Sequence, residues 1–359
     1  MPELFIIDEN WNEQFWFSTG GTRAKKYLLS PDGKYYYFKR SQYKEPTNFK
    51  PGKDFKYEFW SEVIAYELGK QLGFNVLRYD IAIDGNIMGC ISESMIDNES
   101  QELVEGVKYI QSFSPEYNPE KKEHKAYYTF SMIENALTQS KNGQFIESIL
   151  ELIVFDAIIG NGDRHQENWA IITSQKLISE FIEEELINNK ERTNRLYKWA
   201  YKQVKRAIDR YKKVGSKIPK SYYRIQKEFA PIYDSGSSLG RELLEDKVNL
   251  YLESDAELEK YISKGVSEIH WENKKVSHFL LINKLLTETK YSKKTKEIID
   301  KVIERYDGPK IEAIINSIDE KVPDSHKNYK IPDSRKKLIF KMITLRLKRL
   351  ESLPIHERI

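Results

Sequence analysis

One polar segment of the chain places a carboxylate and an amide five residues apart, between two apolar stretches. Asp163 and Asn168 stand at its ends, in the sequence Asp-Arg-His-Gln-Glu-Asn. In loops that transfer a phosphoryl group, such an Asp orients or deprotonates the attacking hydroxyl, and the Asn holds magnesium on the nucleotide phosphates. The spacing therefore predicts a phosphoryl-transfer loop, with Asp163 as the catalytic residue and Asn168 as a metal ligand.

A second acidic loop follows in the order that this chemistry requires. The apolar run 229–233 leads into Asp234, Ser235 and Gly236. Mg²⁺ prefers hard oxygen ligands and usually takes one or two carboxylates in addition to phosphate oxygens and water. Asp-Ser-Gly is also an ordinary turn sequence, but its position downstream of the Asp163 loop favours Asp234 as a second metal ligand.

An upstream segment carries the hydroxyls, small residues and positive charge that suit a phosphate-cradling loop. Its members are Ser18, Thr19, Gly20, Gly21, Thr22 and Arg23. A β-rich run ending in Lys39 follows, as a nucleotide-covering loop precedes the strand whose Lys contacts the α and β phosphates. The next predicted helix offers Glu58 and Glu62 as carboxylates to hold Lys39. The alternative for Lys39 is a solvated residue at a strand edge.

The cysteine and histidine residues predict no metal centre of their own. The single cysteine, Cys90, lies in an apolar run and is expected in the core. It cannot form an internal disulfide, which agrees with a reducing compartment. The six histidines are scattered, and we expect His165 to brace the nucleotide site by hydrogen bonds rather than to act as a base or a ligand.

Length and composition favour a globular protein with two lobes. The chain has 359 residues, of which 40% are hydrophobic and 31% charged, values that are typical of folded, soluble proteins. It shows no signal peptide and no apolar stretch that approaches the length of a membrane span. We therefore expect a cytoplasmic protein without membrane attachment, with secretion as an effector left open.

One segment is strongly basic, although the net charge of the chain is only +3. Residues 190–227 contain fourteen Lys or Arg and two acidic residues, with aromatic residues interleaved. Such a mixture could bind nucleic acid. The alternative, which we favour, is a long helix paired with the acidic segment 178–187, with its aromatics on the buried face. On that interpretation no direct nucleic-acid binding is expected.

Hydrophobic periodicity predicts the elements that position these residues. We expect strands at 35–39, 81–83 and 87–91, the last two joined as a hairpin, and a helix at 59–72 that ends at Gly73. Further helices are expected at 145–159, 291–305, 310–318 and 334–350, and short strands at 169–172 and 230–233. The first part of the chain is therefore a sheet with one helix, and the second is mostly helical.

The two loops resemble those of the HipA-like serine/threonine kinases, which read Asp-x-His-x-x-Asn and then Pro-x-Tyr/Phe-Asp. The resemblance covers most of the chain. It implies a bilobal, protein-kinase-like α+β fold, with a small β-rich N-lobe at 1–97 and a larger, mostly helical C-lobe at 98–359. It also implies ATP and Mg²⁺ as cofactors, and transfer of phosphate to a Ser or Thr of a protein substrate.

The same resemblance assigns roles to single residues of this chain. Asp163 falls on the catalytic Asp of the family, and Asn168 and Asp234 fall on its metal ligands. Lys39 falls on the Lys that contacts the nucleotide. Glu62 matches the helix Glu that holds this Lys, because its spacing to the end of the helix is that of the family.

Other positions carry expectations about regulation and specificity. Ser18 falls on the Ser that members autophosphorylate in the phosphate loop, and Glu93 and Met95 would lie near the hinge that meets adenine. Glu167 stands where several toxin members have Lys, which removes a positive contact near the transferred phosphate. By resemblance, the protein would be the toxin of a toxin–antitoxin pair, with an antitoxin protein as partner, or an effector.

The chain also departs from the family in length. Its phosphate loop begins by about residue 18, so we expect a short form without the extra N-terminal subdomain of the toxin kinases. The segment between the two metal motifs is longer than expected, and we predict a charged helical insertion at about 174–228.

Two alternatives remain open. Phosphoinositide kinases also use Asp-Arg-His-x-x-Asn, so a lipid or small-molecule acceptor is compatible with the first loop. A non-catalytic kinase-like module could instead bind nucleic acid or a partner protein through residues 190–227. The chain keeps all the residues expected of an active kinase site, which argues against a non-catalytic module. These residues are Lys39, Asp163, Asn168 and Asp234.

Overall fold

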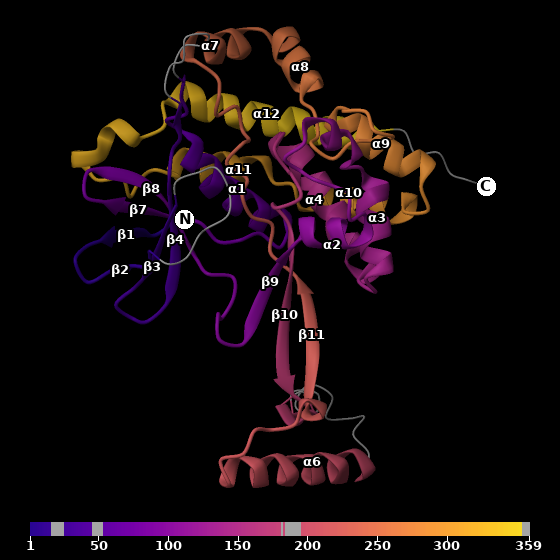
Figure 1. Cartoon of the computed structure of the whole chain (residues 1–359). Helices are drawn as coiled ribbons and strands as arrows, with labels where there is room; N and C mark the ends of the chain where they lie inside the picture. Colours follow the sequence, from indigo (N-terminus) through magenta and orange to yellow (C-terminus); the bar gives the residue numbers. More distant parts are fainter. Residues whose placement is uncertain (16–24, 45–52, 181, 184–194, 354–359) are drawn as a thin grey trace. The chain divides into compact units, whose positions relative to one another are not determined.

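The computed structural model describes residues 1–15, 25–44, 53–180, 182–183 and 195–353 (Figure 1). The chain divides into two compact units. The first consists of Met1–Met95, Glu105–Trp169 and Pro231–Ile359, and the second of Ile96–Val104 and Ala170–Ala230. The Asp163 loop and the Asp234 loop therefore both belong to the first unit.

A six-stranded sheet forms the N-terminal part of the first unit. Its strands, in the order β1-β7-β8-β4-β3-β2, are β1 (Leu4–Ile7), β7 (Asp80–Asp84), β8 (Ile87–Glu93), β4 (Tyr35–Arg40), β3 (Lys25–Leu29) and β2 (Asn12–Glu13). β1 pairs with β7 in parallel and all other neighbours are antiparallel. The short strands β5 (Tyr43–Lys44) and β6 (Lys53–Asp54) form a separate pair. The predicted hairpin at 81–91 is confirmed as β7 and β8.

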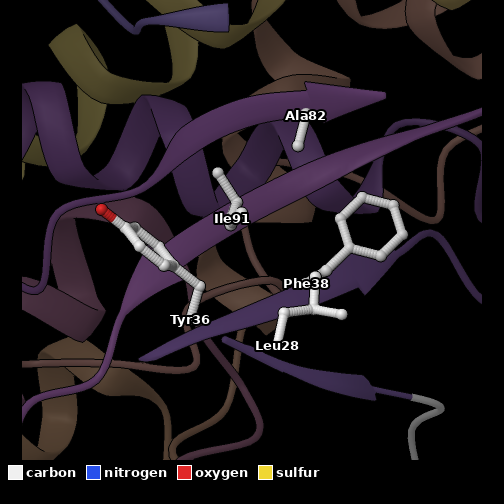
Figure 2. Packing of buried hydrophobic residues seen from close by; sticks show 5 residues of the cluster. All are labelled: Leu28, Tyr36, Phe38, Ala82 and Ile91. Carbon is white, nitrogen blue, oxygen red and sulfur yellow. The ribbon is translucent and has the colours of Figure 1, made fainter. Parts of the chain in front are cut away.

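Strand alternation decides which side chain of β4 can reach the site. Figure 2 shows a cluster of buried side chains on one face of the sheet, made by Leu28, Tyr36, Phe38, Ala82 and Ile91. Successive residues of a strand point to opposite faces. Since Tyr36 and Phe38 belong to this cluster, the next residue on β4 projects from the opposite face, where helix α1 (Glu58–Leu72) packs against β4 and β8.

Close packing between β4 and β8 requires a glycine beside Lys39. Arg40 pairs with Gly89 in the antiparallel ladder. A Cβ atom at Gly89 would lie 2.2 Å from the carbonyl oxygen of Lys39, so no other residue could stand there without moving the strand.

The predicted helix at 59–72 is confirmed as α1. It ends at Gly73, which has a φ of 83°, the left-handed conformation that favours glycine at helix ends.

Helices dominate the rest of the first unit, as the sequence predicted. They are α2 (Gly106–Phe113), α3 (Phe130–Gln139), α4 (Ile146–Ile159), α7 (Glu245–Glu253), α8 (Asp255–Lys264), α9 (His278–Glu288), α10 (Ser292–Arg305), α11 (Gly308–Ser317) and α12 (Asp333–Glu351), with short 3₁₀ helices at Lys122–Tyr127, Gly143–Phe145 and Asp324–Tyr329. The predictions at 145–159, 291–305, 310–318 and 334–350 are confirmed as α4, α10, α11 and α12.

Helix α4 is the central helix of this region. Eleven of its fourteen residues are buried, and it packs against α9, α10 and α12, which is typical of a helix in the core rather than at the surface. It ends at Gly160, which has a φ of 70°. The Asp163 loop begins there, so a rigid, buried element fixes the start of the loop. No helix among the described residues is long and apolar enough to cross a membrane.

The second unit is a three-stranded sheet with one long helix. Its strands are β9 (Gln101–Glu105), β10 (Ala170–Leu177) and β11 (Tyr223–Phe229), in the order β11-β10-β9. β10 and β11 form a long antiparallel hairpin, and α6 (Arg195–Lys213) lies in the sequence between them, beyond the end of the hairpin (Figure 1). A short 3₁₀ helix, Lys220–Tyr222, precedes β11.

Two sequence predictions for this region need correction. The insertion predicted as helical at 174–228 is helical over α6, but its ends are the strands β10 and β11. The strand predicted at 230–233 ends earlier, at Phe229, and Ile232 makes only an isolated bridge to Val76. The reason is Pro231, which has no N–H group to donate to a ladder. The strand predicted at 169–172 is confirmed, and it extends to Leu177.

Candidate active site

The first part of the Asp163 loop is held by a buried amide. Asn161 is 1% exposed, and its Nδ2 donates to Oδ1 of Asp156 at 3.1 Å. Its Oδ1 accepts the backbone N–H of Asp163 at 3.2 Å. Asn161 therefore joins the last turn of α4 to the backbone of the predicted catalytic residue.

A buried arginine holds the rest of the loop. Arg164 is 1% exposed, and its Nε and Nη2 donate to the carboxylate of Asp156 at 3.0 and 2.9 Å. Its Nη1 donates to the carbonyl oxygens of Asn168, at 3.1 Å, and of Tyr233. Burial acts to lower the pKa of Arg164, but the charge of Asp156 raises it above its ordinary value. This one charged group therefore joins the Asp163 loop to the residue before Asp234.

The side chains of Asp163 and Asn168 are held in fixed orientations. Nδ2 of Asn168 donates to the carbonyl oxygen of Asp163 at 2.8 Å, so its Oδ1 is the atom that can face a cation. The hydroxyl of Ser237 donates to Oδ2 of Asp163 at 3.1 Å. A hydroxyl that donates to this carboxylate makes the same contact that an attacking hydroxyl would make with a general base.

The far end of the Asp163 loop rests on helix α2. The backbone N–H groups of Gly106 and Val107 donate to the carbonyl oxygens of Trp169 and Gln166, at 2.8 and 2.9 Å. A Cβ atom at Gly106 would lie 2.1 Å from the indole ring of Trp169. The ring can therefore pack against the start of α2 only because that helix begins with glycine.

Lys39 lies at the centre of a cluster of acceptors. Its Nζ is 3.0 Å from Oε1 of Glu62 and 3.1 Å from Oδ1 of Asp234. It also donates to the hydroxyl of Tyr79 at 3.3 Å. Burial acts to lower the pKa of Lys39, but the charges of Asp234 and Glu62 outweigh it and raise that pKa well above its ordinary value. The two carboxylates therefore favour the charged form of Lys39, and its side chain is buried rather than solvated at a strand edge.

The two glutamates of α1 have different partners. Glu62 bonds Lys39 with one oxygen, and its other oxygen accepts the backbone N–H of Ser235 at 2.7 Å. Glu58 instead pairs with Arg241 and accepts the backbone N–H of Gln42 at 2.9 Å. Glu62, and not Glu58, therefore connects the strand β4 to the Asp234 loop.

Asp234 has an uncommon backbone conformation. Its φ is 56°, in the left-handed region where only a few per cent of residues other than glycine are found, with Asp and Asn enriched. Such conformations cost about 1–3 kcal/mol and concentrate at functional sites. The conformation carries the carboxylate toward Lys39 rather than away from it.

His165 bonds Glu167 within the same loop. Its Nδ1 lies 2.6 Å from Oε2 of Glu167. Burial acts to lower the pKa of His165, but the carboxylate of Glu167 raises it above its ordinary value. Burial in turn acts to raise the pKa of Glu167, but its polar interactions, above all the hydrogen bond to His165, together outweigh burial and lower this pKa below its ordinary value. These bonds brace the Asp163 loop from within.

The other predicted site residues lie apart from this cluster or outside the described residues. Glu93 is 52% exposed in its side chain and pairs with Lys34 at 3.0 Å. Met95 is half-buried, two residues after the end of β8. Residues 18–23, with Ser18 and the rest of the predicted phosphate loop, lie outside the residues that the structure describes.

The oxygen ligands at this site are of the kind that Mg²⁺ accepts. Among the described residues, no group of three or more His, Cys, Asp or Glu side chains could hold a metal. Mg²⁺ does not need such a group, because it keeps several waters and binds through one or two carboxylates and substrate phosphates. Asp234 and the Oδ1 atom of Asn168 offer such oxygen ligands, and Lys39 offers a fixed positive charge for the phosphates.

Four residues that contact the predicted site residues were not identified from the sequence. Ser237 and Tyr79 belong to ordinary-looking segments, and no local pattern distinguishes them. Asp156 and Arg164 carried a signal, because a carboxylate inside an apolar helix such as α4 needs a buried partner.

Comparison with solved structures identifies the fold. No protein-family model matches the chain, and no curated protein sequence matches it. The structure is similar to that of the proinflammatory kinase CtkA of Helicobacter pylori, with a TM-score of 0.61 and 18% sequence identity over 94% of this chain and 92% of CtkA. A second similar structure is the HipA–HipB toxin–antitoxin complex with operator DNA from Shewanella oneidensis MR-1, with a TM-score of 0.40 and 12% identity over 96% of this chain and 64% of that chain. The likeness to CtkA confirms the fold that the sequence resemblance implied, and the chain has a mixed α+β, kinase-like fold with an N-terminal sheet and a helical C-terminal region.

Proposed function

We propose that the chain is an ATP- and Mg²⁺-dependent protein kinase that phosphorylates serine or threonine. The observation that carries this proposal is the position of Lys39, which is bonded at once to Glu62 and Asp234. Protein kinases require an ion pair between a buried lysine and a helix glutamate, together with an aspartate that holds Mg²⁺. Lys39 and Glu62 form such a pair, and Asp234 lies beside them. The kinase-like fold shared with CtkA supports the same conclusion.

Each residue of the cluster has a defined part in this mechanism. Asp163 accepts the proton of the acceptor hydroxyl, and its orientation is set by Ser237. Asn168 and Asp234 would hold Mg²⁺, which neutralises charge on the transferring phosphate when bound. Lys39 would supply positive charge to the α and β phosphates of the nucleotide, and its bond to Glu62 would hold it in position.

The two glutamates of α1 provide a matched pair for testing this mechanism. Glu62→Gln should lower kcat/KM for ATP about 10- to 100-fold, because Lys39 loses the charge that positions it and small misplacements are costly. Glu58→Gln removes a buried carboxylate from the same helix, but its partner is Arg241, and we expect wild-type turnover. The measurement is incorporation of phosphate from labelled ATP with Mg²⁺, and thermal unfolding of both variants shows whether stability contributes.

Equal losses of activity in Glu62→Gln and Glu58→Gln would contradict the role of Glu62.

The same phosphate-transfer assay also distinguishes a protein acceptor from a lipid acceptor. Phosphate transfer to phosphoinositide vesicles, with none to protein, would replace the proposed acceptor class by a lipid. Phosphate mapped by mass spectrometry to Ser18 of the wild type would establish the autophosphorylation that the family resemblance implies.

Ser237 should act on turnover rather than on nucleotide binding. Its hydroxyl donates to Asp163, and a hydrogen bond to a charged group contributes about 1.5–3 kcal/mol. We therefore expect Ser237→Ala to lower kcat about 10-fold or more with an unchanged KM for ATP. Ser237→Thr keeps the hydroxyl and should recover most of the activity. A Thr variant as slow as the Ala variant would show that the loop needs serine for packing and not for this bond.

A further inference from the structure

Helix α6 of the second unit has a basic face with a tryptophan in it. Trp199, Lys202, Arg206, Arg210 and Lys213 follow one another at intervals of three or four residues, which places them on one side of the helix. All five side chains are exposed, and Trp199 is exposed to 62%. The sequence prediction that the aromatics of this segment lie on the buried face is wrong for Trp199.

The opposite side of α6 is already packed within its own unit. Ile208 is 1% exposed, and Val204 is half-buried. The ring of Tyr211 lies 5.9 Å from the ring of Tyr222. The apolar face of the helix is therefore used in the fold, and the basic face remains available to a partner.

The charge on this face has little compensation among the residues that the structure describes. In the part of the chain that the structure describes, Lys202, Arg206, Arg210 and Lys213 make no ion pair, while Lys205 is 3.7 Å from Glu183. Like charges four residues apart destabilise a helix. Residues 190–227 carry a net +12, so the rest of the chain carries −9 to give the total of +3. Such separation of charge produces a surface complementary to a polyanion.

We propose that this face of α6 binds a nucleic-acid strand, with phosphates against the Lys and Arg side chains and a base stacked on Trp199. Proteins that bind single strands combine a positively charged track with exposed aromatic rings in this way. An anionic membrane fits less well. A helix that lies on a membrane inserts a whole apolar face, and Trp199 is the one large apolar side chain on the exposed face of α6 in the described structure.

In the sequence, this surface lies between the two predicted metal loops. The chain enters the second unit at Ala170, two residues after Asn168, and leaves it at Ala230, four residues before Asp234. The proposed nucleic-acid binding is independent of the proposed kinase function, so a result that refutes one leaves the other unchanged.

The test uses the full chain and fluorescence anisotropy with labelled oligothymidine and oligouridine of about 20 nucleotides. The triple variant Lys202→Glu, Arg206→Glu, Arg210→Glu should weaken binding about 30-fold or more and make the dependence on salt clearly shallower, between about 50 and 200 mM. Trp199→Ala should weaken binding about 10-fold without changing the salt dependence, because stacking carries no charge. Circular dichroism of each variant checks that the helix is retained.

A matched triple variant controls for total charge. Lys247→Glu, Lys264→Glu, Lys337→Glu makes the same change at exposed positions of α7, α8 and α12, and we expect it to bind like the wild type. Any of three results with the oligonucleotides would overturn the proposal: no binding by the wild type, equal loss in the two triple variants, or full binding by Trp199→Ala. Binding of polyglutamate or of phosphatidylserine vesicles in place of both oligonucleotides would also overturn it, and would assign the face to an acidic protein or a membrane.

Discussion

Asp163→Asn should abolish phosphate transfer while leaving nucleotide binding almost unchanged. The substitution keeps the size of the side chain, and an amide oxygen can still accept the hydrogen bond from Ser237. It cannot accept the proton of an attacking hydroxyl, and loss of a positioned general base costs about 10²- to 10⁴-fold in rate. Phosphate incorporation from labelled ATP measures the first effect, and calorimetric titration with ATP and Mg²⁺ measures the second.

Asp234→Asn should behave differently, because Asp234 would hold the metal rather than the proton. We expect loss of both Mg²⁺-dependent nucleotide affinity and turnover, as chelation of Mg²⁺ would also produce. Asp300→Asn, which changes an exposed carboxylate of α10, is the control and should leave both properties intact. Undiminished labelling by Asp163→Asn would refute the catalytic assignment. Unchanged Mg²⁺-dependent affinity in Asp234→Asn would refute the metal assignment alone.

The parts of the fold that were predicted from sequence depend on local patterns. Helix α1 follows from apolar residues at helical spacing and from Gly73, which ends it. The β7–β8 hairpin follows from two β-rich runs around a turn sequence. The order of Lys39, Asp163, Asn168 and Asp234 along the chain was readable for the same reason, since each stands at the end of a recognisable run.

What the sequence could not supply depends on tertiary contacts. The residue pattern alone left Glu58 and Glu62 open as partners of Lys39, and only the family resemblance favoured Glu62. The choice requires knowing which face of α1 meets β4, and both residues lie one turn apart on the same helix. The burial of Arg164 depends on Tyr233, which is 69 residues away in the chain. The exposure of Trp199 depends on how α6 packs in its own unit. Ile208 is buried on the other side of the helix, but an aromatic residue on a basic face satisfies no core pattern.

Asp156→Ala should be among the most destabilising single substitutions in the described structure. It would leave the guanidinium of Arg164 charged, 1% exposed and without its carboxylate. Breaking a buried pair from one side costs about 3–5 kcal/mol, because the remaining charge is uncompensated. Denaturant unfolding measures this loss. Glu288→Ala, which breaks the exposed pair of Lys284 and Glu288 at 2.5 Å, should cost no more than about 0.5 kcal/mol.

A double variant separates the contribution of this pair to stability from its contribution to the site. Asp156→Leu with Arg164→Met removes both charges, and apolar replacement of a buried pair is often neutral or stabilising. We expect the double variant to recover most of the free energy of unfolding but not the activity, because the carbonyl oxygens of Asn168 and Tyr233 lose the donor that joins the two loops. If activity returned together with stability, Arg164 would serve the core of the helical region alone. If stability failed to return, the cost of Asp156→Ala would come from a cavity and not from an unpaired charge. A pair retained against its own desolvation cost is explained only by what it positions, and the double variant measures that contribution directly.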